Sequence, residues 1–201
     1  LDRDEHMRPG TDMAALARLP AAFADMGRKG GFDNIVKQRY PQLTHLEHVH
    51  TGGNSSGIVD GAAAILLGSK RIGRKLGLQP RARIVSFANA ACDPCIMLTA
   101  PAPATFAALA RAKKSIADID LFEVNEAFAS VVLRFMSETG APHDRVNVNG
   151  GGIAMGHPIG ATGPMLVNTL VDELERRDVG NGVVTMCVGL GMGVATYIER
   201  V

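Results

Sequence analysis

One glycine-rich string constrains the fold of this chain more than any other feature. It extends from Asn147 to Gly163 and reads Asn-Val-Asn-Gly-Gly-Gly-Ile-Ala-Met-Gly-His-Pro-Ile-Gly-Ala-Thr-Gly. Glycines let the backbone adopt positive φ and pass close to a ligand. A helix predicted over residues 160–177 follows, and its free N–H groups and positive dipole end favour an anionic ligand. His157 is suited to act there as a base or a hydrogen-bond donor. The alternative, a surface histidine in an ordinary turn, fits a string of this length less well.

Two shorter polar strings stand where apolar segments end, which is where α/β folds bind ligands. The first reads Cys-Val-Gly-Leu-Gly-Met-Gly over residues 187–193. Cys187 is either an activated thiol at the end of a strand or a buried core cysteine. The second reads Val-Asn-Glu-Ala-Phe over residues 124–128. Asn125 can orient a water or donate to an oxyanion, and its alternative role is a helix N-cap.

Strand-like and helix-like segments alternate from residue 81 onward. Their apolar patterns predict strands over 82–90, 119–124, 183–188 and 194–198, and helices over 103–113, 127–138 and 160–177. Buried strands that are interleaved with helices and closed by a hairpin predict an α/β fold with a mixed sheet.

The residues before this region are less regular. Residues 1–50 are expected to be irregular with short helices, one of them capped by Thr11 or Asp12. An apolar run over 62–67 has the length of a strand, and residues 69–76 are predicted to form a helix with a basic outer face.

The charge and cysteine content exclude several functions. The 21 basic and 20 acidic residues leave a net charge of +1, so no basic field exists to bind nucleic acid or an anionic membrane. The apolar runs are too short to span a bilayer, and no signal-peptide pattern is visible. Three cysteines do not make a disulfide framework, which favours a reduced, intracellular setting. Cys92 and Cys95 have the spacing of a redox or metal pair, but the Asp-Pro between them is typical of a turn and there is no second pair, so no metal site is predicted.

Together the three strings resemble the thiolase family in residues and in spacing. Two upstream segments, residues 51–62 and 4–9, match further segments of the family, so the resemblance extends along essentially the whole chain. It implies the thiolase fold, a mixed β-sheet with helices on both faces. This chain would be the C-terminal half of a two-half, layered αβαβα architecture.

The resemblance also implies an activity. Thiolases use a cysteine nucleophile to split a 3-ketoacyl-CoA with CoA into acetyl-CoA and a shortened acyl-CoA, or run the reverse Claisen condensation. By this resemblance His157 activates that thiol and, with a water held by Asn125, forms an oxyanion hole for the enolate. Cys187 would be the acid/base at the acetyl carbon, and the N–H of Gly189 would contribute to a second oxyanion hole. Coenzyme A is a substrate here, and no separate cofactor is implied.

Four further residues match family positions that meet CoA. Ser56 corresponds to a residue that touches the pantetheine, and Ala127 and Phe128 correspond to residues that line the pantetheine and acyl tunnel. Arg8 corresponds to a residue at the nucleotide end, although a solvated surface charge is an equal alternative for this side chain.

The nucleophile of the family has no counterpart in this chain, because it lies in the N-terminal half and the surroundings of Cys92 and Cys95 do not match it. The first residues include no initiator Met, and an internal boundary of a longer protein is expected there. By the resemblance, the chain divides into part of the loop domain that covers CoA, the last segment of the N-terminal half, and the C-terminal domain, at 1–50, 51–79 and 80–201. Residues 62–67 are expected to pair with strands outside the chain. The expected partners are CoA thioesters, the missing N-terminal half, and further copies in a dimer or tetramer.

A narrower resemblance points to degradation. The insert at 30–50 and the string at 48–57 are similar to the thiolase subunit of bacterial fatty-acid β-oxidation trifunctional complexes. That similarity implies the α-subunit of such a complex as a partner and the bacterial cytoplasm as the location, with an organellar matrix as the second expectation. A biosynthetic acetoacetyl-CoA thiolase is the alternative.

Two other interpretations share the fold. A ketoacyl synthase has a similar glycine-histidine loop, but that family places no cysteine at the final glycine-rich turn, so Cys187 argues against it. A non-catalytic lipid-binding or scaffold protein is disfavoured because His157, Cys187 and Asn125 are all retained.

Overall fold

Four strands form one mixed sheet in the computed structural model, which describes residues 2–201. The strands, in the spatial order β1-β4-β3-β2, are β1 (Ala82–Ala91), β4 (Met192–Arg200), β3 (Asn181–Val188) and β2 (Leu121–Val124). β2 is parallel to β3, whereas β3 and β1 are both antiparallel to β4. The predicted mixed sheet and its closing hairpin are therefore confirmed.

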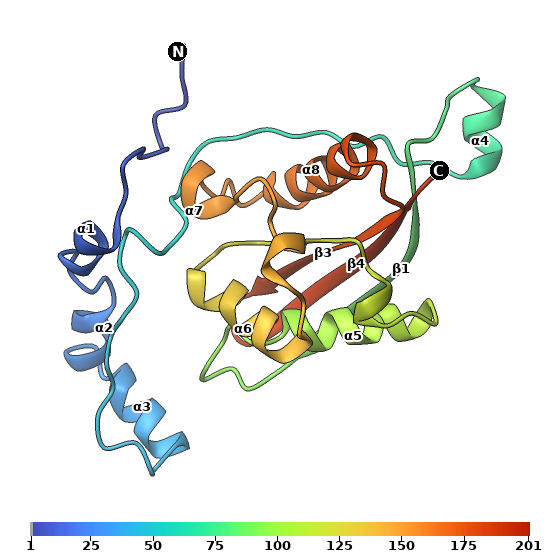
Figure 1. The fold of residues 1–201 in the computed structure, drawn as a ribbon. Coiled ribbons are helices and arrows are strands. Elements are labelled where there is room, and N and C mark those ends of the chain that lie inside the picture. Colours follow the sequence, from blue (N-terminus) through green and yellow to red (C-terminus); the bar gives the residue numbers. More distant parts are fainter. Residues whose placement is uncertain (1) are drawn as a thin grey trace.

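Helices cover both faces of this sheet, as predicted (Figure 1). α8 (Thr162–Arg176) lies on one face, and α5 (Pro101–Arg111) and α6 (Ala129–Thr139) lie on the other. Because side chains alternate between the two faces of a strand, Val183 joins the core next to α5 and α6, and Val184 joins the core next to α8. Among residues 2–201, no helix combines the length and the apolar character needed to cross a membrane.

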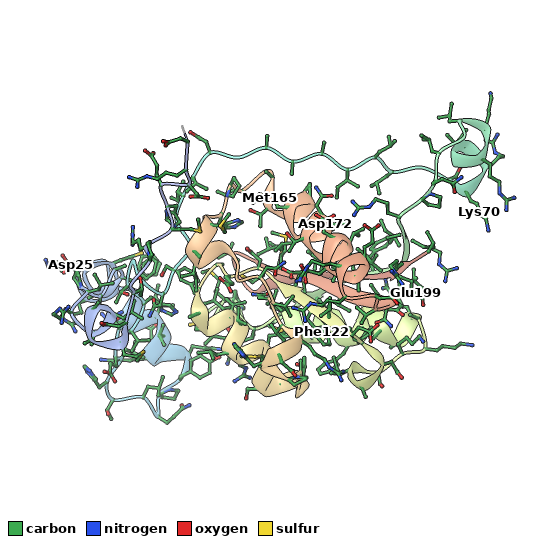
Figure 2. All side chains as sticks on the ribbon, turned by 45° about the horizontal axis from the view of Figure 1, so that its top comes forward. Asp25, Lys70, Phe122, Met165, Asp172 and Glu199 are labelled. Carbon is green, nitrogen blue, oxygen red and sulfur yellow. The ribbon has the colours of Figure 1, made fainter. Side chains whose placement is uncertain are left out.

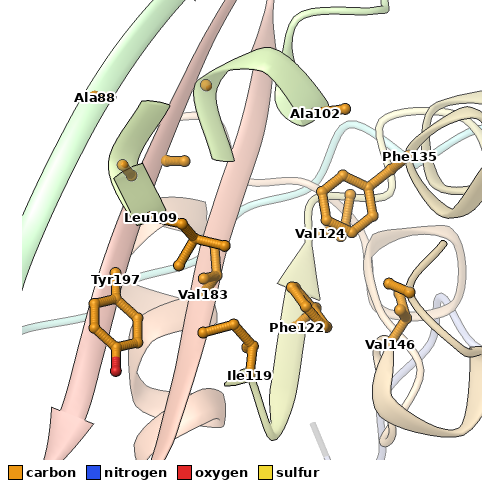
Figure 3. Close-up of a cluster of buried hydrophobic side chains, with 14 of the residues drawn as sticks. Ala88, Ala102, Leu109, Ile119, Phe122, Val124, Phe135, Val146, Val183 and Tyr197 are labelled. Carbon is orange, nitrogen blue, oxygen red and sulfur yellow. The ribbon is translucent and has the colours of Figure 1, made fainter. Parts of the chain in front are cut away.

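The larger core lies between the sheet and the pair α5 and α6. Its largest fully buried side chains are Tyr197, Phe122 and Phe135. The rings of Phe122 and Phe135 meet edge to face with their centroids 5.6 Å apart (Figure 3). Burial of a side chain of this size contributes about 1.5–3 kcal/mol. This packing anchors β2, whose end leads directly into the candidate site.

Three short helices lie beside the sheet, in agreement with the expectation for the first 50 residues (Figure 1). They are α1 (Met13–Ala17), α2 (Ala24–Arg28) and α3 (Phe32–Arg39). Asp12 caps α1 by accepting from the N–H of Ala15 at 2.7 Å. Tyr40 and Arg39 donate to the carboxylate of Asp93 at 2.6 and 2.9 Å, which ties this region to the loop after β1.

An extended segment over residues 58–69 passes α8 and ends at α4 (Lys70–Lys75), the predicted basic helix (Figure 1). α4 therefore lies far from α2, as the positions of Lys70 and Asp25 show (Figure 2). Residues 62–67 are not in a strand, since no strand of the described residues lies alongside to pair with them. Their pairing with strands outside the chain stays a prediction.

Some helix boundaries differ from the sequence prediction. α5 begins at Pro101 rather than at 103, and α6 begins at Ala129 rather than at 127. The pattern also fails to predict α7 (Gly152–Met155), a short helix inside the glycine-rich string. Glycine has a low helix propensity, and a hydrogen bond from the N–H of Ile153 to the side chain of Glu126 contributes to the stability of α7. The apolar pattern also did not predict two single 3-10 turns, η1 (Ile116–Asp118) and η2 (His143–Arg145).

Candidate active site

His157 lies in the loop between α7 and α8, and its backbone is held by a distant segment. Its N–H donates to the carbonyl of Gly57 at 2.8 Å. The preceding Gly156 has φ +91°, and a Cβ there would lie 2.4 Å from a methyl carbon of Val59. Only glycine permits both the left-handed backbone and this close approach. The extended segment therefore packs closely against the glycine-rich string, through Val59 against Gly156 and through the hydrogen bond from His157 to Gly57.

The ring of His157 is oriented by Thr162, a buried residue in the first turn of α8. The Nδ1 atom lies 2.6 Å from Thr162 Oγ1, and that hydroxyl donates to the carbonyl of Pro158 at 3.0 Å. The hydroxyl has a single hydrogen, so the imidazole supplies the hydrogen of the shorter bond. This network places the proton on Nδ1 and leaves the lone pair on Nε2. Burial lowers the pKa of His157, so the imidazole is neutral at pH 7.

Asn125 contacts His157 from the end of β2. Its Nδ2 lies 3.5 Å from His157 Nε2, and its backbone N–H donates to the carbonyl of Thr185 on β3 at 2.9 Å. The side chain is buried, and Oδ1 has no hydrogen-bond partner within residues 2–201. A buried acceptor without a partner marks a place for a water or a ligand donor. The N-cap alternative for Asn125 is wrong, because the N-cap position of α6 is occupied by Phe128.

Cys187 lies near the end of β3, paired in register with Gly193 of β4. It is a free, partly buried thiol that packs against the larger core. Burial raises the pKa of the Cys187 thiol, which favours its protonated form. A protonated thiol at this position can donate a proton.

The turn after Cys187 contains Gly189 and packs against the loop that contains Cys92 and Cys95. Gly189 is exposed, and a Cβ built there would meet no heavy atom within 4 Å. The carbonyl of Gly191 accepts from the N–H of Cys92 at 2.7 Å. Gly191 has φ +87°, a left-handed conformation that favours glycine. Asp93 accepts from the N–H of Cys95 at 2.9 Å. The Asp-Pro segment is therefore a turn that packs against the final hairpin.

Of the remaining predicted residues, Ser56 is bound to Ala127, which directly precedes Phe128, whereas Arg8 has no such link to the others within residues 2–201. Ser56 donates through both its N–H and its hydroxyl to the carbonyl of Ala127, at 3.0 and 3.2 Å. Phe128 packs edge to face against His50, with ring centroids 4.9 Å apart. Arg8 is exposed and, in the described part of the chain, makes no side-chain hydrogen bond or ion pair with any of these residues.

Glu126 and Asn147 are structural residues of the site to which reasoning from the sequence assigned no role. Glu126 accepts hydrogen bonds from Asn147 Nδ2 at 3.0 Å and from the N–H of Ile153 at 3.1 Å. Both residues belong to strings that the sequence singles out, but the pattern along the chain does not indicate that they meet. The only indication of a role for Glu126 in the sequence was that this carboxylate directly follows Asn125.

Known proteins share both this sequence and this fold. A family profile described as "Thiolase, C-terminal domain" matches residues 78–200. A 3-ketoacyl-CoA thiolase from Serratia proteamaculans is 44% identical over 203 residues, which cover 100% of this chain and 47% of that protein. The crystal structure of the Bacillus anthracis acetyl-CoA acetyltransferase matches with a TM-score of 0.84 and 39% identity, over 99% of this chain and 45% of that one. Human mitochondrial 3-ketoacyl-CoA thiolase in complex with CoA matches with a TM-score of 0.80 and 35% identity, over 98% and 45%.

This chain belongs to the thiolase family, and its fold is that of the thiolase C-terminal domain. It spans about half the length of the relatives that it matches. Those relatives include both 3-ketoacyl-CoA thiolases and acetyl-CoA acetyltransferases.

Proposed function

We propose that this chain supplies half of the active site of an acyltransferase that cleaves a 3-ketoacyl-CoA with CoA. One observation carries the proposal, which is the contact between His157 and Asn125. A neutral imidazole with a free Nε2 lies 3.5 Å from a buried amide, and the oxygen of that amide has no partner among residues 2–201. The nucleophilic cysteine comes from an N-terminal half that is not part of this chain.

In the proposed reaction, Nε2 of His157 takes the proton of the incoming cysteine thiol, and the sulfur attacks the 3-keto carbon of the substrate. The bond between carbons 2 and 3 breaks, and the carbanion beside the thioester takes a proton from Cys187 to give acetyl-CoA. The imidazolium of His157 and a water on Asn125 stabilise the enolate oxygen during this step. A second CoA thiol then gives its proton to the Cys187 thiolate and attacks the acyl-cysteine, whose oxyanion the N–H of Gly189 stabilises. The bond from the carbonyl carbon to the cysteine sulfur breaks, His157 returns its proton to that sulfur, and the shortened acyl-CoA leaves.

CoA is proposed to lie along the residues that surround this contact. Ser56, Ala127 and Phe128 hold the pantetheine and acyl parts, and Arg8 meets the nucleotide end. The contact of Ser56 with Ala127 supports this placement, as does the solved thiolase that holds CoA. Residues 1–50 then form part of the domain that covers CoA.

The missing half is proposed to cover apolar side chains that this chain leaves exposed. Ile58 and Leu66 are 94% and 82% exposed, and Phe87 on β1 is 63% exposed. In this proposal residues 51–79 are the last segment of the N-terminal half, and residues 80–201 are the C-terminal domain. The assembled protein is expected to form a dimer or tetramer.

Produced alone, the chain is expected to aggregate or to remain incompletely folded, because large apolar surfaces promote association. Analytical ultracentrifugation and near-ultraviolet circular dichroism test this expectation. A stable, cooperatively folding monomer would contradict the assignment of the exposed surface to a missing half.

Thiolysis is tested in a chimera, called here the completed enzyme. It joins the part of the Serratia proteamaculans thiolase that precedes the matched region to residue 1 of this chain. The completed enzyme is expected to consume acetoacetyl-CoA only when CoA is present, whereas the chain alone has no activity. A folded chimera without thiolysis would favour the non-catalytic alternative, and malonyl-dependent condensation would favour a ketoacyl synthase.

We further propose a degradative role, as the thiolase subunit of a bacterial β-oxidation complex in the cytoplasm. The relatives named 3-ketoacyl-CoA thiolase support this role, and those named acetyl-CoA acetyltransferase support the biosynthetic alternative. Comparison of kcat/KM for long 3-ketoacyl-CoA substrates and for acetoacetyl-CoA separates the two. Preference for the long substrates, together with co-purification of an α-subunit, is the degradative result.

A further inference from the structure

A carboxylate next to Asn125 joins the two loops that form the candidate site. Glu126 Oε1 accepts from Asn147 Nδ2 at 3.0 Å, and Oε2 accepts from the N–H of Ile153 at 3.1 Å. Ile153 is in α7, the short helix that directly precedes the loop of His157. Glu126 therefore connects the end of β2, where Asn125 lies, to the element that delivers His157.

Asn147 strengthens this connection by binding the end of β2 as a neighbouring strand would. Its Oδ1 accepts from the N–H of Val124 at 2.7 Å, and its Nδ2 donates to the carbonyl of Val124 at 2.9 Å. An amide nitrogen has two hydrogens, and the second is the one donated to Glu126. Every polar group of the Asn147 side chain is thus used, so its position fixes that of the carboxylate.

The backbone of the glycine-rich string is shaped to accommodate this carboxylate. A Cβ at Gly151 would lie 2.7 Å from Glu126 Cδ and 2.9 Å from its Oε2. Gly151 has φ −171°, an extended conformation that any residue can adopt. Glycine is therefore needed at this position for space rather than for conformation, and the space is filled by Glu126.

A neutral amide cannot replace the carboxylate. Two donors point at Glu126, one to each oxygen, whereas glutamine offers one oxygen and turns its own donors toward the other partner. In a Glu126→Gln variant either Asn147 or Ile153 loses its acceptor, and an unpaired donor in a partly buried site is costly. The shape of the side chain is kept, so the change tests the hydrogen bonds and not the packing.

We propose that Glu126 is a positioning residue that holds α7 against the end of β2, so that His157 Nε2 and the water proposed on Asn125 face one reacting oxygen. The kinetic consequence of this inference rests on the proposed thiolase function. A displacement of about 1 Å in a catalytic group can reduce a rate by about a hundredfold. Loss of one of two anchors is therefore expected to reduce kcat by about tenfold or more.

The test compares three variants of the completed enzyme. Glu126→Gln removes one anchor, and Gly151→Ala displaces the carboxylate without altering it. Glu138→Gln is the matched control, because it makes the same chemical change at an ion pair with Arg134 at the far end of α6. The first two variants are expected to lower kcat by about tenfold or more while KM changes less than about twofold. The control is expected to match the wild type.

A second readout does not depend on turnover. The imidazole carbon of His157 is followed by NMR in enzyme labelled at histidine, over a pH titration. Glu126→Gln and Gly151→Ala are expected to move the titration of His157 toward that of a solvent-exposed histidine, whereas the control leaves it unchanged.

The outcomes separate the inference from the proposed function. Unchanged kcat and an unchanged His157 titration in Glu126→Gln would overturn the positioning role. A lower kcat accompanied by a comparable fold-increase in KM and by a lower thermal midpoint would also overturn it, because this combination indicates a general structural role. A wild-type chimera without thiolysis refutes the proposed function alone, since the NMR titration still decides whether Glu126 positions His157.

Discussion

Replacement of His157 by alanine in the completed enzyme is expected to lower kcat for thiolysis by about a thousandfold, within the range that general acid–base catalysis supplies. The variant removes the only proposed acceptor for the thiol proton of the nucleophile. It also removes one of the two groups proposed to stabilise the enolate. Steady-state thiolysis of acetoacetyl-CoA measures the loss, and the rate at which iodoacetamide alkylates the nucleophile measures the loss of thiol activation separately.

His143→Ala is the matched control, because His143 is exposed in η2 and its side chain makes no hydrogen bond or ion pair in the described residues. It is expected to retain full activity. The acidic limb of the wild-type pH profile is expected below pH 6.5, because burial lowers the pKa of His157 from that ordinary value. A His157→Ala enzyme with more than about a tenth of the wild-type kcat would exclude His157 as the base.

Replacement of Glu173 by glutamine is expected to lower the free energy of unfolding by about 2 kcal/mol at pH 7. This buried carboxylate on α8 accepts hydrogen bonds from Arg176 at 2.7 Å, Arg177 at 2.8 Å and Asn149 at 2.7 Å. These bonds, led by that from Arg176, lower the pKa of Glu173 to about 2. A shift of that size corresponds to about 3 kcal/mol, and the expected value is smaller because Arg176 is 61% exposed and regains water when the carboxylate is lost.

The same pKa sets the pH range of the effect. A carboxyl whose pKa is lower in the folded state stabilises the protein above its ordinary pKa, and that stabilisation is lost as the pH falls toward the folded-state value. The difference between wild type and Glu173→Gln should therefore be complete above about pH 5 and less than half as large at pH 3. Urea unfolding of the completed enzyme at both pH values measures it.

Glu175→Gln serves as the control for this prediction. Glu175, which is also in α8, forms an exposed ion pair with Arg81, the residue before β1, and exposed pairs contribute about 0–1 kcal/mol. A difference between wild type and Glu173→Gln that stays constant between pH 7 and pH 3 would show that the ion-pair network does not provide the stabilisation.

The strands and the longer helices of the C-terminal domain could be predicted because their apolar periodicity reports directly on burial. The resemblance to thiolases implied that Asn125 and His157 act together, and the structure places them in contact. The start of α6 at Ala129 could not be predicted. Asn125 is of a residue type that favours an N-cap, but its N–H donates to the carbonyl of Thr185 on β3, and this contact between distant segments cannot be seen in the sequence.

The class of the sheet could be read from the sequence because apolar periodicity is a local property, and the thiolase resemblance because its motifs are short strings along the chain. How the residues of the site work together depends on contacts that only the fold creates. Thr162 places the proton of the His157 ring, and Glu126 anchors α7 through Asn147 and Ile153. Each of these is a hydrogen bond between groups that the fold brings together, and hydrogen bonds depend on distances and angles that no pattern along a chain contains.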